Sequence, residues 1–558
     1  MRKDKIIICC SILAFGLLAL FGVYLRYFPV ILSPTFTNIM IIGLIVVLLA
    51  LLVFEPFQIT RSLDTYILLP QYLLFAFLVR AATTLRLTYQ PLDDPNYYAV
   101  CTRNILDFGT LEPIYSWWYP LVQQQLVWPD LHLLGAVLTH ITNIFSVDVL
   151  RLSLPLYGML FFLGAFLLAR EVTKNTTVAF LAGLFASTAD SVIFYQAEYH
   201  PQGLAIILFV FLMVLVVRYL TTGSSTTAIL VLIYLVAISF CHHFTSLYLG
   251  IFSLYMFVML WLPRTIYIAI FGYNPIPNIR ATSVFWLLAS MMMFLNHLYN
   301  YPSFISSVKG LLGNTAPFGQ LITAGQTIPL QVTVLNSSKY ILLVLALISI
   351  IYVLKTKDER EFLAVILVAG IGVSGVVATF VAYVPVDRLI TFYISFAAIF
   401  ASLTLYRVKN NWFAQVRHSL KTATIVAISL VILFAGPFNF MPPAIILHDL
   451  PEDPYYWHDN DFTAFSTFGV PGYWIKDHIE TSAKFSTYNE TTMIPFFYGE
   501  HPLNNIYGGS STGINSDYYI AEANYAPNQG DTGKNSVLLN YAENSIYTMG
   551  RFHIGTGG

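Results

Sequence analysis

The chain has 558 residues, of which 57% are hydrophobic and only 10% are charged. A soluble domain has about a quarter charged residues, so this composition excludes an ordinary soluble protein. The formal net charge of −1 does not indicate a nucleic-acid partner.

The apolar residues occur in runs long enough to cross a membrane. A helix needs about 20 apolar residues to span the hydrocarbon core, and irregular backbone cannot face lipid. The sequence therefore predicts an all-α polytopic membrane protein with about 13 transmembrane helices. The predicted spans are 6–25, 37–54, 66–83, 150–169, 176–194, 202–220, 228–244, 246–262, 282–300, 340–354, 362–384, 391–406 and 422–441.

Basic residues indicate the orientation. Arg2, Lys3 and Lys5 precede the first apolar run, which is longer than the core of a cleaved signal peptide. With the N-terminus in the cytoplasm, the inner segments hold about twice as many Lys and Arg residues as the outer membrane loops, in line with the positive-inside rule. We expect a multi-pass integral protein of the plasma membrane, in which odd-numbered spans lead outward.

The first long outer region is the loop 84–149. It contains a predicted helix from Pro95 to Phe108, closed by Gly109. An apolar stretch from Leu131 to Phe145 follows, which is too short to span the membrane. We expect that stretch to form a helix lying at the membrane surface.

Residues 1–441 form the predicted membrane domain, and residues 442–558 form a separate one. The latter are rich in Tyr, Asn, Asp and Gly and contain no spanning run. We expect a small extracytoplasmic domain of mixed α and β structure. Its last residues, 555–558, read Gly-Thr-Gly-Gly, and we expect no final strand or helix there.

Two adjacent carboxylates, Asp93 and Asp94, open the outer loop between Pro91 and Pro95. Adjacent carboxylates repel each other, so we expect one of the two to have a raised pKa. A carboxyl group with a raised pKa suits acid-base catalysis. An alternative is that Asp94 caps the helix that begins at Pro95. Both roles fit together, because a capped helix start also fixes the position of a neighbouring carboxylate.

This loop resembles the first outer loop of the GT-C glycosyltransferases. The residues that carry the resemblance are Asp93-Asp94-Pro95-Asn96-Tyr97, then Ile105-Leu106, Gly109 and Pro113. They are most similar to the branch of the protein O-mannosyltransferases and the aminoarabinose transferase of lipid A. The chain departs from that branch in its Asp-Asp pair, where Asp-Glu is commoner, and in the extra spans before the loop.

The resemblance implies an inverting transfer of a sugar from a polyprenyl phosphate, such as dolichyl phosphate, to an acceptor hydroxyl at the outer face. The acceptor would be a protein, a lipid or a glycan. Asp93 corresponds to the catalytic base of the family, and Tyr97 to a tyrosine that follows the acidic pair. The family therefore implies membrane lipid and a lipid-linked sugar donor as partners.

Three arginines are candidates for the phosphate of the donor. Arg388 lies between the eleventh and twelfth predicted spans, and Arg80 and Arg86 flank the acidic loop. A guanidinium binds phosphate oxygens in bidentate fashion. The alternative for Arg388 is an interfacial side chain paired with Asp387, and for the other two an anchor at the membrane surface.

Polar residues also gather at the outer ends of later spans. Glu198 and His200 lie in the short loop 195–201, and His242 and His243 end the seventh span. These side chains either bind the acceptor or hold a divalent metal ion, and the residues leave both open. Asp190, inside the fifth span, is a further candidate because acids are rare at membrane depth.

Two other functions are compatible with the composition. One is an oligosaccharyltransferase-like enzyme, but Trp117-Trp118-Tyr119-Pro120 lacks the acid and glycine of the Trp-Trp-Asp-Tyr-Gly signature. The other is a lipid or sugar transporter, a flippase, which would place its polar residues near mid-membrane and often shows internal repeats. Here the polar residues lie at span ends and no repeat is visible, which disfavours a transporter. The adjacent acids, in place of Asp-x-Asp, and the missing signature favour a transferase of a single sugar.

Overall fold

The computed structural model describes most of the membrane region and parts of the remainder. The described residues are 3–27, 34–59, 62–84, 101–106, 108–111, 128–144, 146–197, 200–263, 265–266, 268, 280–300, 330–356, 358–382, 386–410, 418–440, 475, 479–480, 483, 485–487, 506–508, 518–522, 542–549 and 552–557.

The chain divides into two compact units. The first unit comprises Met1–Arg86, Leu154–Ala197 and Pro201–His448. The second unit comprises Leu87–Ser153, Glu198–His200 and Asp449–Gly558. The second unit thus groups most of the long outer loop and residues 198–200 with the C-terminal region. The domain division predicted from the sequence instead has a single boundary, at residue 441.

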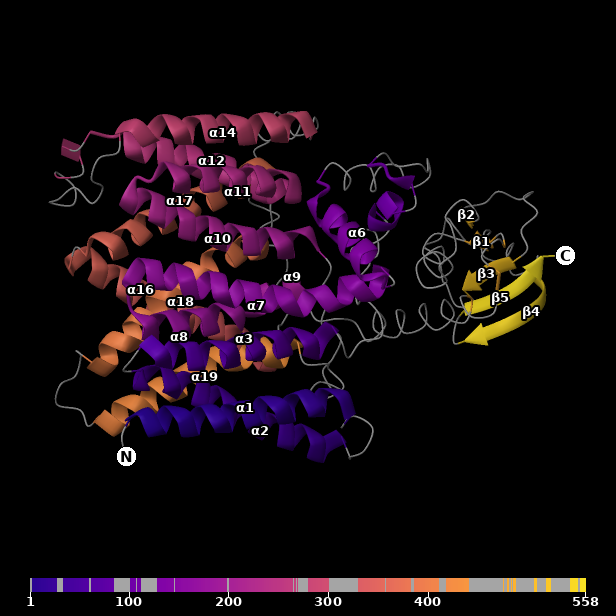
Figure 1. The fold of residues 1–558 in the computed structure, drawn as a ribbon, viewed down its shortest axis with the longest axis horizontal. Helices are drawn as coiled ribbons and strands as arrows, with labels where there is room; N and C mark the ends of the chain where they lie inside the picture. The colour runs from indigo at the N-terminus through magenta and orange to yellow at the C-terminus, as the bar shows by residue number, and fades with distance from the viewer. Residues whose placement is uncertain are drawn as a thin grey trace. The chain divides into compact units, whose positions relative to one another are not determined.

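The first unit is a bundle of helices that run side by side (Figure 1). It begins with α1 (Lys3–Tyr27), α2 (Pro34–Phe54), the 3-10 turn η2 (Glu55–Gln58) and α3 (Ser62–Thr84). The middle helices are α7 (Ser146–Thr173), α8 (Thr176–Ser187), α9 (Asp190–Ala197), α10 (Pro201–Thr222), α11 (Ser225–Cys241) and α12 (His243–Trp261). The later helices are α14 (Arg280–Asn300), α16 (Leu330–Thr356), α17 (Glu359–Ala382), α18 (Val386–Asn410) and α19 (His418–Phe440).

Eight of the described helices are long and apolar enough to cross a membrane, and five shorter apolar helices accompany them. These helices coincide with the predicted spans, so the chain is a helical integral membrane protein. The number of helices that cross the bilayer, and the side on which each end lies, stay predictions. One predicted span is wrong in detail, because 176–194 is not one helix: α8 ends at Ser187 and α9 begins at Asp190.

Aromatic and small side chains pack the interior of this bundle. Helix α12 packs on α14 and α17, and α18 packs on α8 and α16. The ring centroids of Phe209 and Phe392 lie 4.9 Å apart, and Tyr248 stacks on Phe392 at the same distance. Aromatic pairs at this separation contribute about 0.5–1.5 kcal/mol beyond their buried area. These contacts join α10, α12 and α18 into one core.

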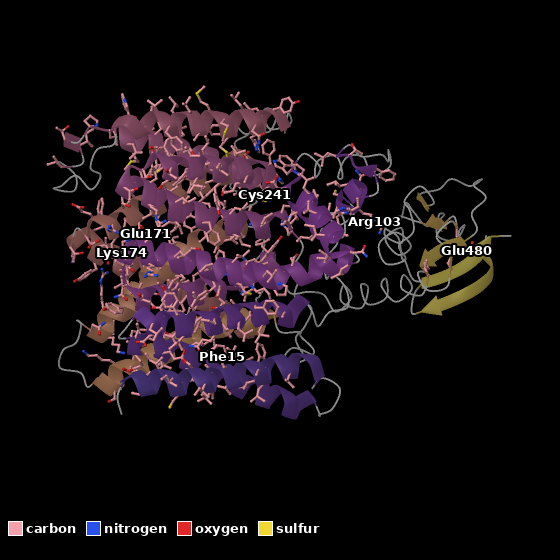
Figure 2. All side chains as sticks on the ribbon, viewed as in Figure 1. Phe15, Arg103, Glu171, Lys174, Cys241 and Glu480 are labelled. Atoms are coloured by element: carbon pink, nitrogen blue, oxygen red, sulfur yellow. The ribbon has the colours of Figure 1, made fainter. Side chains whose placement is uncertain are left out.

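Ion pairs gather at one end of the bundle. Lys174 Nζ lies 3.0 Å from a carboxylate oxygen of Glu171. Figure 2 shows these two residues at one end of the helices and Cys241 toward the opposite end. Arg407 donates to Glu361 and to Ser349 Oγ at 2.9 Å, and this network joins α18, α17 and α16. The basic side chains here belong to segments predicted to face the cytoplasm.

The described parts of the outer loop are helical. Residues 101–106 form part of a helix, and Gly109 adopts φ +65° while its N–H donates to the carbonyl of Ile105 at 2.9 Å. A glycine at φ > 0 that takes up a terminal carbonyl is a common helix end, so Gly109 closes this helix as predicted.

Helix α6 (Asp130–Thr142) has two unlike faces. Leu131 and Ala136 are buried, whereas Leu133, Val137 and Ile141 are exposed. The exposed apolar residues recur at the helical period and therefore form one face. An apolar face without a protein cover is typical of a helix at a membrane surface, as the sequence predicts for this stretch.

The described C-terminal residues form a five-stranded sheet in the order β2-β1-β3-β5-β4. The strands are β1 (Phe485–Thr487), β2 (Ile506–Gly508), β3 (Tyr518–Glu522), β4 (Ala542–Met549) and β5 (Phe552–Gly557). β1 runs parallel to β2 and β3, and β5 runs antiparallel to β3 and β4. The expectation that the chain ends without a strand is wrong, because Gly555 and Thr556 pair with Tyr519 and Tyr518. The mixed α and β domain as a whole stays a prediction, since most of 442–558 lies outside the described residues.

Candidate active site

The acidic pair and its closest predicted partners lie outside the described residues. These are Asp93, Asp94, Tyr97, Arg86 and Glu198. Their roles stay predictions. The ends of α3 and α9 and the start of α10 flank these segments, and α8 and α11 pack beside these helices.

Arg80 lies near the end of α3, four residues before that helix ends at Thr84. Its side chain is fully buried, at 0% exposure. One guanidinium nitrogen donates to the backbone carbonyl of Ser187, and Nη2 donates to Gln196 Oε1 at 2.7 Å. Arg80 therefore joins the helix before the acidic loop to both sides of the α8–α9 break.

A glycine makes room for this arginine. A Cβ built at Gly158 in α7 would lie 2.5 Å from the carbonyl oxygen of Ala76 and 2.8 Å from Arg80 Cδ. Both distances are shorter than real Cβ contacts allow, so only glycine fits between the two helices. The close approach of α7 to α3 places the Arg80 side chain toward α8 and α9.

The break between α8 and α9 provides one of the acceptors for Arg80. Helix α8 ends because Thr188 leaves the helical conformation, and its hydroxyl donates back to the carbonyl of Leu184 at 2.7 Å. A helix end leaves its last carbonyls without intrahelical donors, and in a membrane these groups need other partners. Arg80 supplies one for Ser187.

Asp190, the acid predicted as a candidate inside the fifth span, starts α9. Its carboxylate accepts from the Ser191 N–H at 2.7 Å and is half-buried. This contact gives Asp190 a local role at the start of the helix, where a carboxylate also interacts well with the helix dipole.

Three histidines lie around the junction of α11 and α12. His242 is buried and its Nδ1 is hydrogen-bonded to Thr245 Oγ1 at 2.8 Å. His242 and His243 have ring centroids 4.9 Å apart, and His297 of α14 contacts the backbone of His243. Asn296 Nδ2 donates to the carbonyl of Ser239 at 3.0 Å, which fixes α14 against α11. His297 is a residue that sequence reasoning missed, since it follows an ordinary amphipathic run.

A metal site is not assembled by the part of the chain that the structure describes. There, no group of three or more His, Cys, Asp and Glu side chains lies together in a way that could hold a metal ion. A protein metal site usually provides three or four ligands, and His242 and His243 alone do not. Because Glu198 lies outside the described residues, metal binding stays a prediction.

His200 and Arg388 are described in part. The His200 side chain is 5% exposed. Arg388 is the third residue of α18, in its first turn, and its side chain lies outside the description. The first turn of a helix has free backbone N–H groups, and this end attracts anions.

Burial raises the pKa of one further acidic residue, which lies outside the predicted spans. Asp130, the first residue of α6, is partly buried, and this burial raises its pKa to about 6. Desolvation disfavours the charged carboxylate, which is the physical cause of the shift. Nothing in the sequence pattern singles out Asp130.

Known proteins match this chain in structure but not in sequence. No protein-family model and no curated protein matches the sequence. ArnT from Cupriavidus metallidurans bound to undecaprenyl phosphate is 10% identical, and the match covers 89% of this chain and 98% of that one, with a TM-score of 0.54. The apo structure of the same protein gives the same identity and coverage with a TM-score of 0.50. The Archaeoglobus fulgidus oligosaccharyltransferase in complex with Zn and sulfate is 14% identical, covers 81% and 68% of the two chains, and has a TM-score of 0.48.

At these identities the likeness to ArnT shows the fold. The chain is a multi-pass membrane protein that shares its fold with ArnT, so the fold implied by the resemblance in the sequence is confirmed. The comparisons do not separate the branches of that superfamily.

Proposed function

We propose that the chain is an inverting glycosyltransferase that moves a sugar from a polyprenyl-phosphate-linked donor to an acceptor hydroxyl on the outer face of the membrane. The observation that carries the proposal is the shared fold with ArnT over 98% of that chain, which was solved with undecaprenyl phosphate. A bundle of apolar helices suits a donor whose lipid tail stays in the bilayer while its sugar reaches the surface.

The reaction is a single displacement at the anomeric carbon. Asp93 accepts the proton of the acceptor hydroxyl as the hydroxyl oxygen attacks. The bond between the anomeric carbon and the phosphate oxygen breaks on the opposite face, so the configuration inverts. The polyprenyl phosphate leaves with the electron pair of that bond and gains negative charge. Asp94 caps the helix that begins at Pro95 and so fixes the loop that carries Asp93.

The leaving phosphate requires positive charge or oriented N–H groups. Arg388 meets this need from the first turn of α18, where the free N–H groups add to the attraction for an anion. Arg80 is engaged with Ser187 and Gln196, so we assign it to holding the α8–α9 break against α3. Arg86, His200, His242 and His243 are assigned to binding the acceptor or the sugar.

The acidic pair offers a matched test. Asp93→Asn keeps the size of the side chain but cannot accept a proton, and loss of a general base typically costs about 100- to 10,000-fold in rate. Asp94→Asn should cost far less, because Asn is also a good helix cap. Sugar transfer from a polyprenyl-phosphate sugar in liposomes measures both, with protein level and melting temperature as controls. Wild-type rates in both variants would contradict the mechanism, and a dead Asp94→Asn beside an active Asp93→Asn would reverse the two roles.

A further inference from the structure

The carboxamide of Gln196 has a fixed orientation. Its Oε1 accepts from Arg80 Nη2 at 2.7 Å, and the whole side chain is buried at 0% exposure. A guanidinium carries only donors, so it must face the carboxamide oxygen and never the amide nitrogen. The Nε2 group of Gln196 therefore points away from Arg80.

That amide nitrogen is buried and has no acceptor within the residues described here. A buried donor without an acceptor costs about 1–3 kcal/mol, and such groups in a folded protein call for an explanation. The hydroxyl of Tyr157 in α7 is in the same situation, on a side chain that is 4% exposed. Tyr157 directly precedes Gly158, the residue against which Arg80 packs. Two unused donors thus lie on helices that both contact Arg80.

The contact with Arg80 also strengthens the unused donor. When a carboxamide oxygen accepts from a cation, the amide is polarised and its N–H groups become better donors. Hydrogen bonds to an ionised acceptor are roughly twice as strong as neutral ones. A charged acceptor oxygen would therefore gain more from this site than a sugar hydroxyl.

Because of these features, we propose that Gln196 is a ligand for a phosphate oxygen of the lipid-linked donor, with Tyr157 as a second donor to the same group. Arg80 is the positioning residue that aims the carboxamide. This inference rests on the proposed function and adds to it a substrate contact on α9. Glu198 and His200 follow Gln196 within four residues along the chain.

The test is binding of undecaprenyl phosphate to the full-length protein in nanodiscs. Gln196→Glu keeps the contact with Arg80 but replaces the donor with an anionic oxygen, and Gln196→Met removes both polar groups at similar size. Each should weaken binding about tenfold or more, since a hydrogen bond to a charged group is worth that factor. Tyr157→Phe, which removes one oxygen and leaves the packing intact, should weaken binding about three- to tenfold.

Four controls accompany these variants. Gln58→Glu makes the same chemical change in η2, away from Arg80, and should bind like wild type. Undecaprenol, which lacks the phosphate, should bind wild type and variants alike, and inorganic phosphate alone should not bind at comparable concentration. The melting temperature without lipid reports whether each variant is folded.

The outcomes separate the inference from the proposed function. Wild-type affinity in folded Gln196→Met and Tyr157→Phe proteins would overturn the phosphate assignment. Normal binding of undecaprenyl phosphate with a raised KM for the complete donor would place the carboxamide on the sugar and equally overturn it. Absence of both undecaprenyl phosphate binding and sugar transfer in the wild type would instead remove the proposed function.

Discussion

Gly158→Ala tests whether α7 and α3 approach as closely as the structure shows. The new methyl group would lie 2.5 Å from the Ala76 carbonyl oxygen, whereas ordinary contacts begin at 3.4 Å. Since the Ala76 oxygen belongs to the backbone, a change of rotamer cannot relieve the clash. One helix must shift by about 0.9 Å, the difference between those two distances. Overpacking of this kind costs about 1–3 kcal/mol.

The matched control is Gly16→Ala in α1, where a Cβ would meet nothing within 4 Å. Alanine is favoured over glycine in a helix interior by about 0.5–1 kcal/mol, so this variant should be as stable as wild type or slightly more so. Unfolding in mixed micelles with rising dodecyl sulfate, followed by tryptophan fluorescence, measures both free energies. Equal values for the two variants would refute the close approach and with it the packing of Gly158 against Arg80.

Two further predictions concern charge. Arg388→Ala should reduce transfer from the lipid-linked donor more than Arg388→Lys, because lysine keeps the charge but loses the bidentate geometry; near-normal rates in both would leave Arg388 as an interface anchor. Because burial raises the pKa of Asp130 from 3.8 to about 6, its charged form is disfavoured in the folded protein and stability should fall as pH rises through that window. Asp130→Asn should remove this part of the fall, which solvent screening limits to no more than about 1 kcal/mol, and melting temperatures from pH 4 to 7 in detergent would show it; an unchanged pH profile would contradict the shift.

The positions of the membrane helices could be predicted from the sequence because they depend on local apolar runs. The interruption at Thr188 was not predicted, since the run contains no Pro or Gly there and the polar residues Ser187, Thr188, Asp190 and Ser191 are the local signal of a helix boundary. The terminal strand β5 was also missed. Its glycines disfavour a strand locally, and its pairing with β3 links residues that lie between 30 (Glu522 and Phe552) and 38 (Tyr518 and Thr556) positions apart.

In the candidate site too, some residues have a local signal in the sequence and others do not. The acidic pair, Arg388 and the histidines of the seventh span could be proposed as candidates from residue type, at span ends and next to an apolar run, and their roles stay predictions. Gln196 could not, although it lies at the edge of a polar loop that the sequence did single out. Its orientation depends on Arg80, 116 residues earlier in the chain, and such a contact leaves no local pattern.

The placement of Arg80 has a consequence for biogenesis. Helix α3 leaves the ribosome before its two acceptors exist, since Ser187 and Gln196 are 107 and 116 residues further along the chain. Arg80 lies near the end of α3, so it opposes insertion by less than the about 2.5–3.5 kcal/mol of an arginine at a helix centre, but α3 is also the least apolar of the eight candidate spans. We therefore expect the Arg80 side chain to reach its final hydrogen bonds only after α8 and α9 have been synthesised.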